Sequence, residues 1–213
     1  ARTLAAAVSY RSAGTVEYLV DVATGRAHFL EVNPRLQVEH PVTEAVTGID
    51  LVEWMLRLAL GEQVLDGVPD HGPAVRGHAV EARICAEDPV HDHRRAGGLL
   101  TRVRFPEGVR VDSGIETGAV VTPHYDPLLA KVVATGPTRD AALTALGAAL
   151  AQTRIDGVPT NLAQLRAALA DPAVGAAAHT TATLAGIAVT EPRIDVLRGG
   201  TLTTVQDFPG RTG

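Results

Sequence analysis

The stretch Glu31-Val32-Asn33-Pro34-Arg35-Leu36-Gln37-Val38-Glu39-His40 is the most informative part of the 213-residue sequence. Its polar side chains fall on the odd positions, and apolar ones fall on the even positions between them. Side chains two residues apart share one face of an extended chain, so that face would carry Glu31, Asn33, Arg35, Gln37 and Glu39. Such a face is typical of a solvated sheet surface or of the wall of a charged site, and alternation alone favours the solvated surface.

A second strand is predicted just before this stretch. The β-rich runs Thr15 to Val22 and Ala27 to Asn33 flank Ala23-Thr24-Gly25, and Gly25 suits the left-handed position of a three-residue hairpin loop. With this loop, the positions that pair across the hairpin sum to 48. A two-residue loop would give a different register, so the loop length decides which side chains face one another.

The three-residue loop places Glu17 directly opposite Glu31. Opposed carboxylates destabilise a sheet unless a cation lies between them, and hard oxygen ligands suit Mg²⁺ or Mn²⁺. Asn33, the next residue on the same face, adds a carbonyl oxygen. A two-residue loop would instead put Glu17 opposite Val32 and remove the predicted metal site.

Arg35 and Glu39 follow the predicted metal ligands, four residues apart on the expected extended face. The planar guanidinium of Arg35 suits an oxyanion, and Glu39 can act as a base if its surroundings raise its pKa. An anion site beside a metal, with a base within reach, suits phosphoryl transfer to a small oxyacid. The sequence has no GxxxxGK[ST] phosphate-binding loop, so a nucleotide site would be of another kind.

The remaining sequence predicts an α+β organisation. A helix from Leu51 to Leu60 is expected to begin at an Asp50 N-cap, and residues Glu62 to Pro73 mark a boundary. Strands are predicted at His78 to Cys85, Leu99 to Phe105, Val109 to Asp112 and Leu128 to Ala134. Helices are predicted from about Thr138 to Gln152, with Ala142, Leu146, Ala149 and Leu150 on one side, and from near Thr160 to just before Asp171. A third is predicted near Thr180 to Ala185. A last hairpin is predicted from Ile194 to Leu197 and Thr201 to Val205.

Composition limits the classes of function. The chain is 46% hydrophobic and 20% charged, with a net charge of −5 that is spread along the sequence, which argues against nucleic acid as a partner. No apolar run approaches the ~20 residues of a membrane span and the start lacks a signal-peptide pattern, so we expect a soluble protein with no membrane partner. Cys85 is the one cysteine, which favours a reduced, cytoplasmic setting.

Several motifs together resemble the biotin carboxylase family. Residues 14–18 and 29–44 are similar to the C-terminal part of its ATP-grasp domain, and residues 48–51, 76–84, 86–89 and 125–131 are similar to its C-terminal domain. The resemblance covers about residues 1 to 187. It implies an ATP-grasp part at 1–70, an antiparallel-sheet biotin carboxylase C-terminal domain at 71–187, and a linker with the start of a further domain at 188–213.

The resemblance also implies roles for residues of the metal and anion sites. Glu17 and Glu31 would be metal ligands, and Asn33 would support the metal and the phosphate. Arg35 would hold bicarbonate and the carboxyphosphate intermediate, while Glu39 would deprotonate bicarbonate.

Further residues are assigned by the same resemblance. The backbone around Gln37 and Val38 would cradle the anion. Arg102 matches the arginine that stabilises the biotin enolate, and Asp126 matches an acidic residue near the biotin pocket.

The implied reaction is the carboxylation of biotin on a carrier domain, with ATP, bicarbonate and Mg²⁺ or Mn²⁺. The family's glycine-rich lid and phosphate-binding lysines would lie upstream of Ala1, so we expect a segment of a longer chain that is inactive alone. Lys131, the one lysine, lacks the flanking methionines of a biotin carrier signature. The carrier and carboxyltransferase domains are therefore expected elsewhere on the same polypeptide, and we expect a homo-oligomer.

The last residues narrow the expected family. Residues 194–211 resemble the opening of the carboxyltransferase domain that follows biotin carboxylase in urea carboxylase. Two alternatives stay open: the biotin carboxylase of an acyl-CoA or pyruvate-type carboxylase, and a non-catalytic assembly module with the same fold.

Overall fold

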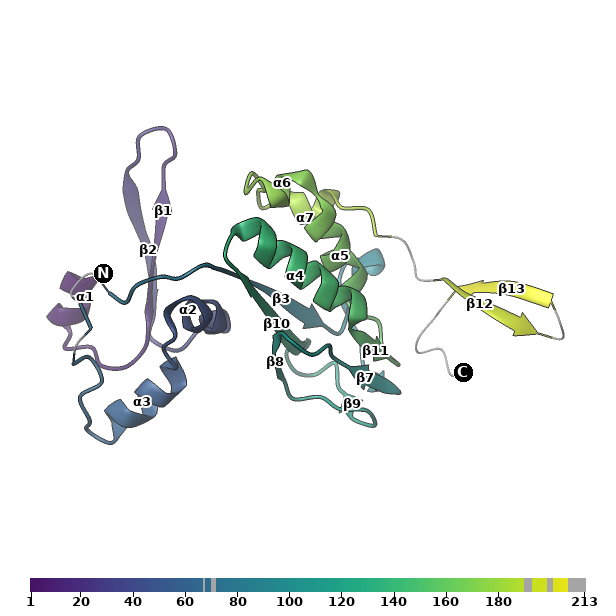
Figure 1. Cartoon of the computed structure of the whole chain (residues 1–213), viewed down its shortest axis with the longest axis horizontal. Coiled ribbons are helices and arrows are strands. Elements are labelled where there is room, and N and C mark those ends of the chain that lie inside the picture. Colours follow the sequence, from purple (N-terminus) through teal and green to yellow (C-terminus); the bar gives the residue numbers. More distant parts are fainter. Residues whose placement is uncertain (67, 70–71, 190–192, 199–200, 207–213) are drawn as a thin grey trace. The chain divides into compact units, whose positions relative to one another are not determined.

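A computed structural model describes residues 1–66, 68–69, 72–189, 193–198 and 201–206 (Figure 1). The contacts divide the chain into two compact units, Ala1–Arg76 and Gly77–Gly213. Among the described residues, no helix is long and apolar enough to cross a bilayer. The mixture of helices with antiparallel strand pairs in both units confirms the α+β prediction.

The first unit contains a two-stranded sheet and three helices. Its elements are α1 (Arg2–Ala7), β1 (Thr15–Val20), β2 (Ala27–Asn33), α2 (His40–Thr47) and α3 (Leu51–Ala59). The two strands form an antiparallel hairpin. The side chain of Asp50 accepts a hydrogen bond from the backbone N–H of Glu53, so the predicted N-cap of α3 is confirmed.

The predicted hairpin loop is wrong, although the pairing predicted for Glu17 is confirmed. The backbone N–H of Asp21 donates to the carbonyl of Arg26, which leaves a loop of residues 22–25, and Gly25 takes the predicted left-handed conformation with φ +67°. Tyr18 then pairs with Phe29, whereas Glu17 pairs with Glu31, so Leu30 is an extra residue in β2. This β-bulge offsets the longer loop and restores the register at the carboxylates.

The second unit is built on a three-stranded antiparallel sheet in the order β3 (His78–Cys85), β10 (Leu128–Gly136) and β8 (Arg110–Ser113). Short antiparallel pairs surround it: β4 (Glu87–Asp88) with β5 (Arg94–Arg95), β6 (Gly98–Leu99) with β9 (Val120–Val121), and β7 (Arg102–Arg104) with β11 (Arg154–Asp156). A 3-10 turn, η1 (Pro89–His91), connects β4 to β5.

The strand predicted from Leu99 to Phe105 is interrupted. The backbone N–H of Leu100 donates to the carbonyl of Ala119, and that of Thr101 donates to the carbonyl of Asp156. The segment therefore exchanges partners between β6 and β7, and alternation in the sequence does not reveal such a change of partner.

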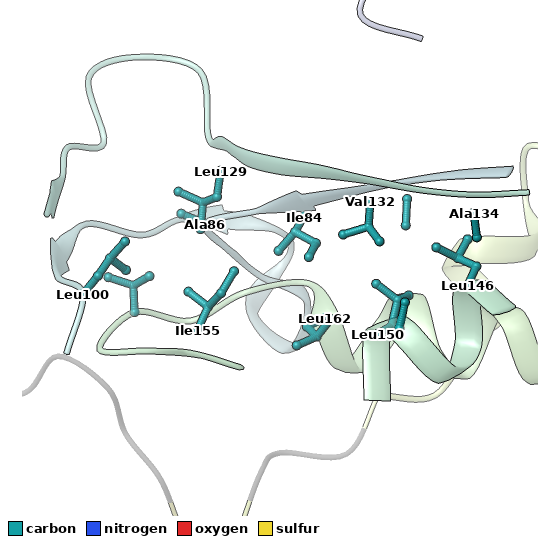
Figure 2. Close-up of a cluster of buried hydrophobic side chains, with 13 residues drawn as sticks. Ile84, Ala86, Leu100, Leu129, Val132, Ala134, Leu146, Leu150, Ile155 and Leu162 are labelled. Carbon is teal, nitrogen blue, oxygen red and sulfur yellow. The ribbon is translucent and has the colours of Figure 1, made fainter. Parts of the chain in front are cut away.

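Two helices cover one face of the sheet, as Figure 1 shows for α4 (Arg139–Gln152) and α5 (Leu162–Ala170). The predicted helix positions are confirmed: Thr138 caps α4, and Ala142, Leu146, Ala149 and Leu150 are buried. The core cluster joins Leu146, Ala149 and Leu150 to Ile84 on β3 and Val132 on β10 (Figure 2). The short helices α6 (Pro172–Gly175) and α7 (Thr183–Gly186) follow.

The predicted last hairpin is confirmed. β12 (Arg193–Arg198) pairs antiparallel with β13 (Thr201–Gln206). The rest of the predicted carboxyltransferase opening, after residue 206, lies outside the described residues.

Candidate functional site

The carboxylates of Glu17 and Glu31 converge on one atom. Asn33 Nδ2 lies 2.8 Å from Glu17 Oε1 and 3.0 Å from Glu31 Oε1, and it donates to both. Gln37 Nε2 also donates to Glu17 Oε1, at 3.3 Å. Two acidic side chains on neighbouring strands therefore share one electropositive group, where their mutual repulsion would otherwise be destabilising.

This arrangement fits a hard divalent cation. Half a turn of the Asn33 side-chain amide would present Oδ1 beside the two carboxylates, which gives three oxygen donors of the kind that Mg²⁺ and Mn²⁺ bind. The described residues contain no group of three or more His, Cys, Asp and Glu side chains suited to a metal. Since Mg²⁺ in nucleotide sites keeps waters and substrate phosphates as ligands, a set of two carboxylates and an amide is compatible with it.

The expected extended face from Glu31 to Glu39 is wrong beyond Asn33. β2 ends at Asn33, and Pro34 follows, which lacks the N–H that a strand pairing needs. Residues 37–40 instead form a turn in which the N–H of His40 donates to the carbonyl of Gln37. Arg35 and Glu39 are both exposed, and Arg35 donates to the carbonyl of Leu36 at 3.3 Å. Glu39 is thus presented by the turn that leads into α2.

The two predicted site residues of the second unit lie on different elements. Arg102 is an exposed residue of β7, opposite Asp156 on β11. Asp126 precedes β10, and its Oδ1 accepts a hydrogen bond from the N–H of Leu128 at 2.8 Å. No hydrogen bond, ion pair or strand pairing described in this unit joins Arg102 to Asp126.

Arg83 lies on β3, two residues before Cys85, and was not singled out from the sequence. Burial raises the pKa of the Cys85 thiol to about 11, with further raising by the charges of Glu87 and Asp126 and lowering by Arg83. The charges of Arg83 and Asp126 thus shift the pKa of one half-buried thiol at the end of β3 in opposite directions. The alternation of Glu81, Arg83 and Cys85 along the predicted strand could have indicated a shared face.

Two contacts hold the backbone on either side of this group. Asn161 Oδ1 accepts from the N–H of Cys85 at 2.9 Å, and its Nδ2 donates to the carbonyl of Arg83 at 3.0 Å. Arg95 donates to the carbonyl of Tyr125 at 3.3 Å, next to Asp126. The side chain of Arg83 itself donates to Glu81 Oε1 at 3.2 Å, and the side chain of Glu81 is only 6% exposed.

Other titratable residues have local structural partners. His91 Nδ1 lies 2.7 Å from Asp88 Oδ2, and His93 Nδ1 lies 3.4 Å from Glu87 Oε2. Lys131 is 9% exposed and pairs with Asp112 at 3.2 Å. Cys85 is half-buried on the Arg83 side of β3, because Ile84 takes the core position.

Two family matches divide the chain close to the boundary between its two units. Residues 1–66 match the family described as carbamoyl-phosphate synthase L chain, ATP binding domain, and residues 81–186 match the biotin carboxylase C-terminal domain. The urea amidolyase of Lachancea kluyveri is 43% identical over 216 residues, which is 100% of this chain and 12% of that protein.

Solved structures agree in fold. The urea carboxylase of Kluyveromyces lactis matches with a TM-score of 0.84 and 43% identity, over 99% of this chain and 18% of that one. The biotin carboxylase domain of the Hydrogenobacter thermophilus 2-oxoglutarate carboxylase, solved in complex with MgADP, ADP and bicarbonate, matches with a TM-score of 0.81 and 36% identity, over 85% of this chain and 40% of that one.

The chain thus spans less than half the length of each of these relatives. The family matches nevertheless cover most of both units. The chain belongs to the biotin carboxylase family.

Proposed function

We propose that this chain is part of an ATP-dependent ligase that carboxylates carrier-bound biotin with bicarbonate, within a urea carboxylase-like enzyme. The observation that carries the proposal is the convergence of Glu17 and Glu31 on one point beside Asn33. This point would hold Mg²⁺ or Mn²⁺. The bound cation would neutralise the negative charge of the ATP phosphates and so assist phosphoryl transfer.

The turn after β2 would handle the small oxyanion. Arg35 lies next to the metal-bearing strand and would bind bicarbonate, and later carboxyphosphate, through its planar guanidinium. The backbone around Gln37 and Val38 would help to cradle this anion. Glu39 would accept the bicarbonate proton at its carboxylate, as a general base.

In the second unit, Asp126 would lie beside the biotin pocket. Arg102 would stabilise the biotin enolate, and Arg83, two residues before Cys85 on β3, is a second candidate for this role. A guanidinium held by the carboxylate of Glu81 would be placed to stabilise a developing oxyanion.

The wider setting is proposed from the relatives. A urea amidolyase and a urea carboxylase match nearly the full chain, which supports urea or a related nitrogen compound as the final acceptor. We further propose that carrier and carboxyltransferase domains lie on the same polypeptide, that the enzyme is a homo-oligomer, and that it works in the cytoplasm.

The test is bicarbonate-dependent ATP cleavage by the full-length polypeptide that carries this segment. Glu39→Gln is expected to lower the rate by about 10²-fold or more, as loss of a general base does. Arg35→Ala should raise the apparent KM for bicarbonate. Arg26→Ala, at an exposed position beside the hairpin loop, is the matched control and should leave turnover unchanged. Full turnover in both site variants would refute the assigned roles.

Parallel variants decide between the two arginines. If Arg83 has the enolate role, Arg83→Ala should abolish carboxylation of biotin while ATP cleavage driven by bicarbonate continues, and Arg102→Ala should have little effect. The reverse result would restore the assignment of Arg102. Equal losses in carboxylation and in bicarbonate-driven cleavage would indicate that neither arginine acts on biotin alone.

Two other functions have distinct signatures. The similarity to the 2-oxoglutarate carboxylase domain keeps a 2-oxo acid or acyl-CoA acceptor under test, and competition between urea, such acids and acyl-CoAs for carboxylated biotin separates them. A non-catalytic assembly module would bind no Mg²⁺-nucleotide, so nucleotide binding by the full-length protein counts against it.

A further inference from the structure

Two contacts of His40 with the same carbonyl oxygen close the turn that presents Glu39. The carbonyl oxygen of Gln37 accepts the backbone N–H of His40 at 3.2 Å, and it also lies 2.8 Å from His40 Nδ1. A carbonyl oxygen can only accept a hydrogen bond, so Nδ1 must be the protonated nitrogen of the ring. His40 therefore donates to one oxygen from both its main chain and its side chain.

The opposite edge of the imidazole faces a buried carboxylate. His40 Nε2 lies 4.0 Å from Glu44 Oε2, one helical turn along α2, and Glu44 is 8% exposed. Glu44 Oε1 accepts from the N–H of Leu51 at 2.7 Å, at the first residue of α3. The ring of His40, whose side chain is 14% exposed, is thereby held between the turn and the junction of α2 with α3.

The turn joins the base to the metal-bearing strand. Val38 and Glu39 are its two central residues, between Gln37 and His40. The side chain of Gln37 reaches back to Glu17 Oε1 at 3.3 Å. A change in the turn would therefore displace the Glu39 carboxylate and the Gln37 amide relative to Glu17.

We propose that His40 is a positioning residue for the bicarbonate site, acting through the hydrogen bond from Nδ1–H to the Gln37 carbonyl. The inference rests on the proposed function, in which Glu39 is the base that accepts the bicarbonate proton, so that its position matters. In this role both ring nitrogens face groups of the protein: Nδ1 donates to the Gln37 carbonyl, and Nε2 lies 4.0 Å from Glu44 Oε2. Misplacing a reacting group by ~1 Å can reduce rates by about 10²-fold, so a small movement of this turn is sufficient.

Three variants of the full-length polypeptide separate the hydrogen bond from packing. In His40→Asn, the side-chain amide can replace Nδ1–H, whereas His40→Phe keeps a ring without a donor. Thr43→Ala, on the exposed side of α2, is the control. For bicarbonate-dependent ATP cleavage, we expect kcat/KM for bicarbonate to fall about 10-fold or more in His40→Phe and less than about 3-fold in His40→Asn.

Binding of Mg²⁺-ATP without bicarbonate should change little in any variant, because the carboxylates of Glu17 and Glu31 are intact. A loss of stability alone would lower nucleotide binding and bicarbonate turnover together. Equal bicarbonate kinetics in the Phe and wild-type proteins would overturn the inference, as would equal loss in the Asn and Phe variants.

Hydrogen exchange provides a readout that is independent of the reaction. We expect the amides of residues 38–40 to exchange faster in His40→Phe and at nearly the wild-type rate in His40→Asn, measured by mass spectrometry of the full-length protein. Unchanged exchange in the Phe variant would refute the role of His40 even if the protein has another activity. The proposed function fails separately, if Glu39→Gln leaves bicarbonate-dependent cleavage intact.

Discussion

The two units of the chain differ in how much of their sequence is buried. In Ala1–Arg76, the buried residues among those described are Pro41, Glu44 and Val64. In the second unit, thirteen clustered apolar side chains from the sheet, α4, α5 and neighbouring segments form a continuous core (Figure 2). Among the described residues of the first unit, the side chains of the proposed metal site are held by polar contacts, such as those of Asn33 and Gln37 with Glu17.

The contrast extends to exposed apolar surface. Along β1 and β2, Leu19, Val20, Phe29 and Leu30 are all more than half exposed. Val132, Leu146 and Leu150 in the second unit are fully buried or nearly so. Because stability follows buried apolar area, equivalent substitutions should have very different effects in the two units.

The largest expected difference is in the free energy of unfolding, between leucine-to-alanine substitutions in the two units. Leu150→Ala removes a side chain that is 0% exposed and should lower the free energy of unfolding by about 3 kcal/mol. Leu19→Ala, at a position 61% exposed, should change it by less than ~0.5 kcal/mol. Urea denaturation of the 213-residue chain, followed by a probe in each unit, measures both. Equal losses would contradict the contrast between the units.

Alanine substitutions at two glycines with positive φ, one in each unit, should also differ in their cost to stability. A Cβ at Gly157, where φ is +109°, would lie 2.0 Å from the carbonyl oxygen of Leu99, so Gly157→Ala should destabilise the second unit by about 2 kcal/mol or more. Gly48, after α2, also has a positive φ, but nothing lies within 4 Å of the position that an alanine methyl would occupy, so Gly48→Ala should cost only about 1 kcal/mol. Thermal unfolding of both variants tests this ranking. A larger fall in Tm for Gly48→Ala than for Gly157→Ala would refute it.

Cys85 tests the electrostatics of the Arg83 and Asp126 region. Its raised pKa, about 11 against an ordinary value of 9.0, means that the folded protein retains the thiol proton. At pH 8 the thiolate population should be about 100-fold lower than in the urea-unfolded chain, so alkylation by iodoacetamide should be correspondingly slow. The raised pKa favours folding below pH 9, and this contribution is lost as the pH rises through 11. Equal alkylation rates in folded and unfolded protein would contradict the environment described.

Among these predictions, the smallest change is expected in the affinity for Mn²⁺ when Leu30 is deleted. Removing Leu30 takes away the bulge residue, and the shortened strand still places Glu31 opposite Glu17. Affinity for Mn²⁺ should therefore stay within roughly threefold of the wild-type value, because the register at the carboxylates is kept. Leu30→Ala, which retains the bulge, is the control. A large loss in the deletion variant alone would show that the bulge itself shapes the metal site.

Much of the second unit could be predicted because its signals are local and periodic. β3 has the predicted bounds, and α4 buries the predicted side chains. The break between β6 and β7 escaped prediction, because Leu100 and Thr101 bond to segments distant in the sequence. Hydrogen bonds to distant segments determine where β6 ends and β7 begins, and the pattern of residues along the segment does not reveal those bonds.

The candidate site was predictable only in part. The opposition of Glu17 and Glu31 is correct, but two errors compensate in the prediction: the loop is one residue longer than expected, and the bulge at Leu30 restores the register. The expected extended face failed at Pro34, where local chemistry should have outweighed alternation. The turn at residues 37–40, in which the backbone and the ring of His40 both contact the Gln37 carbonyl, is not indicated by the alternation of the sequence.

The central claim is that Glu17 and Glu31 together hold a divalent cation. The most direct test is Mn²⁺ binding to the full-length polypeptide in the presence of ATP, measured for the wild type, Glu17→Gln, Glu31→Gln and the double variant. The account predicts that each single variant loses at least ~10-fold in affinity and that the double variant loses much less than the product of the two, because both residues bind one ion. Wild-type affinity in either single variant would contradict it.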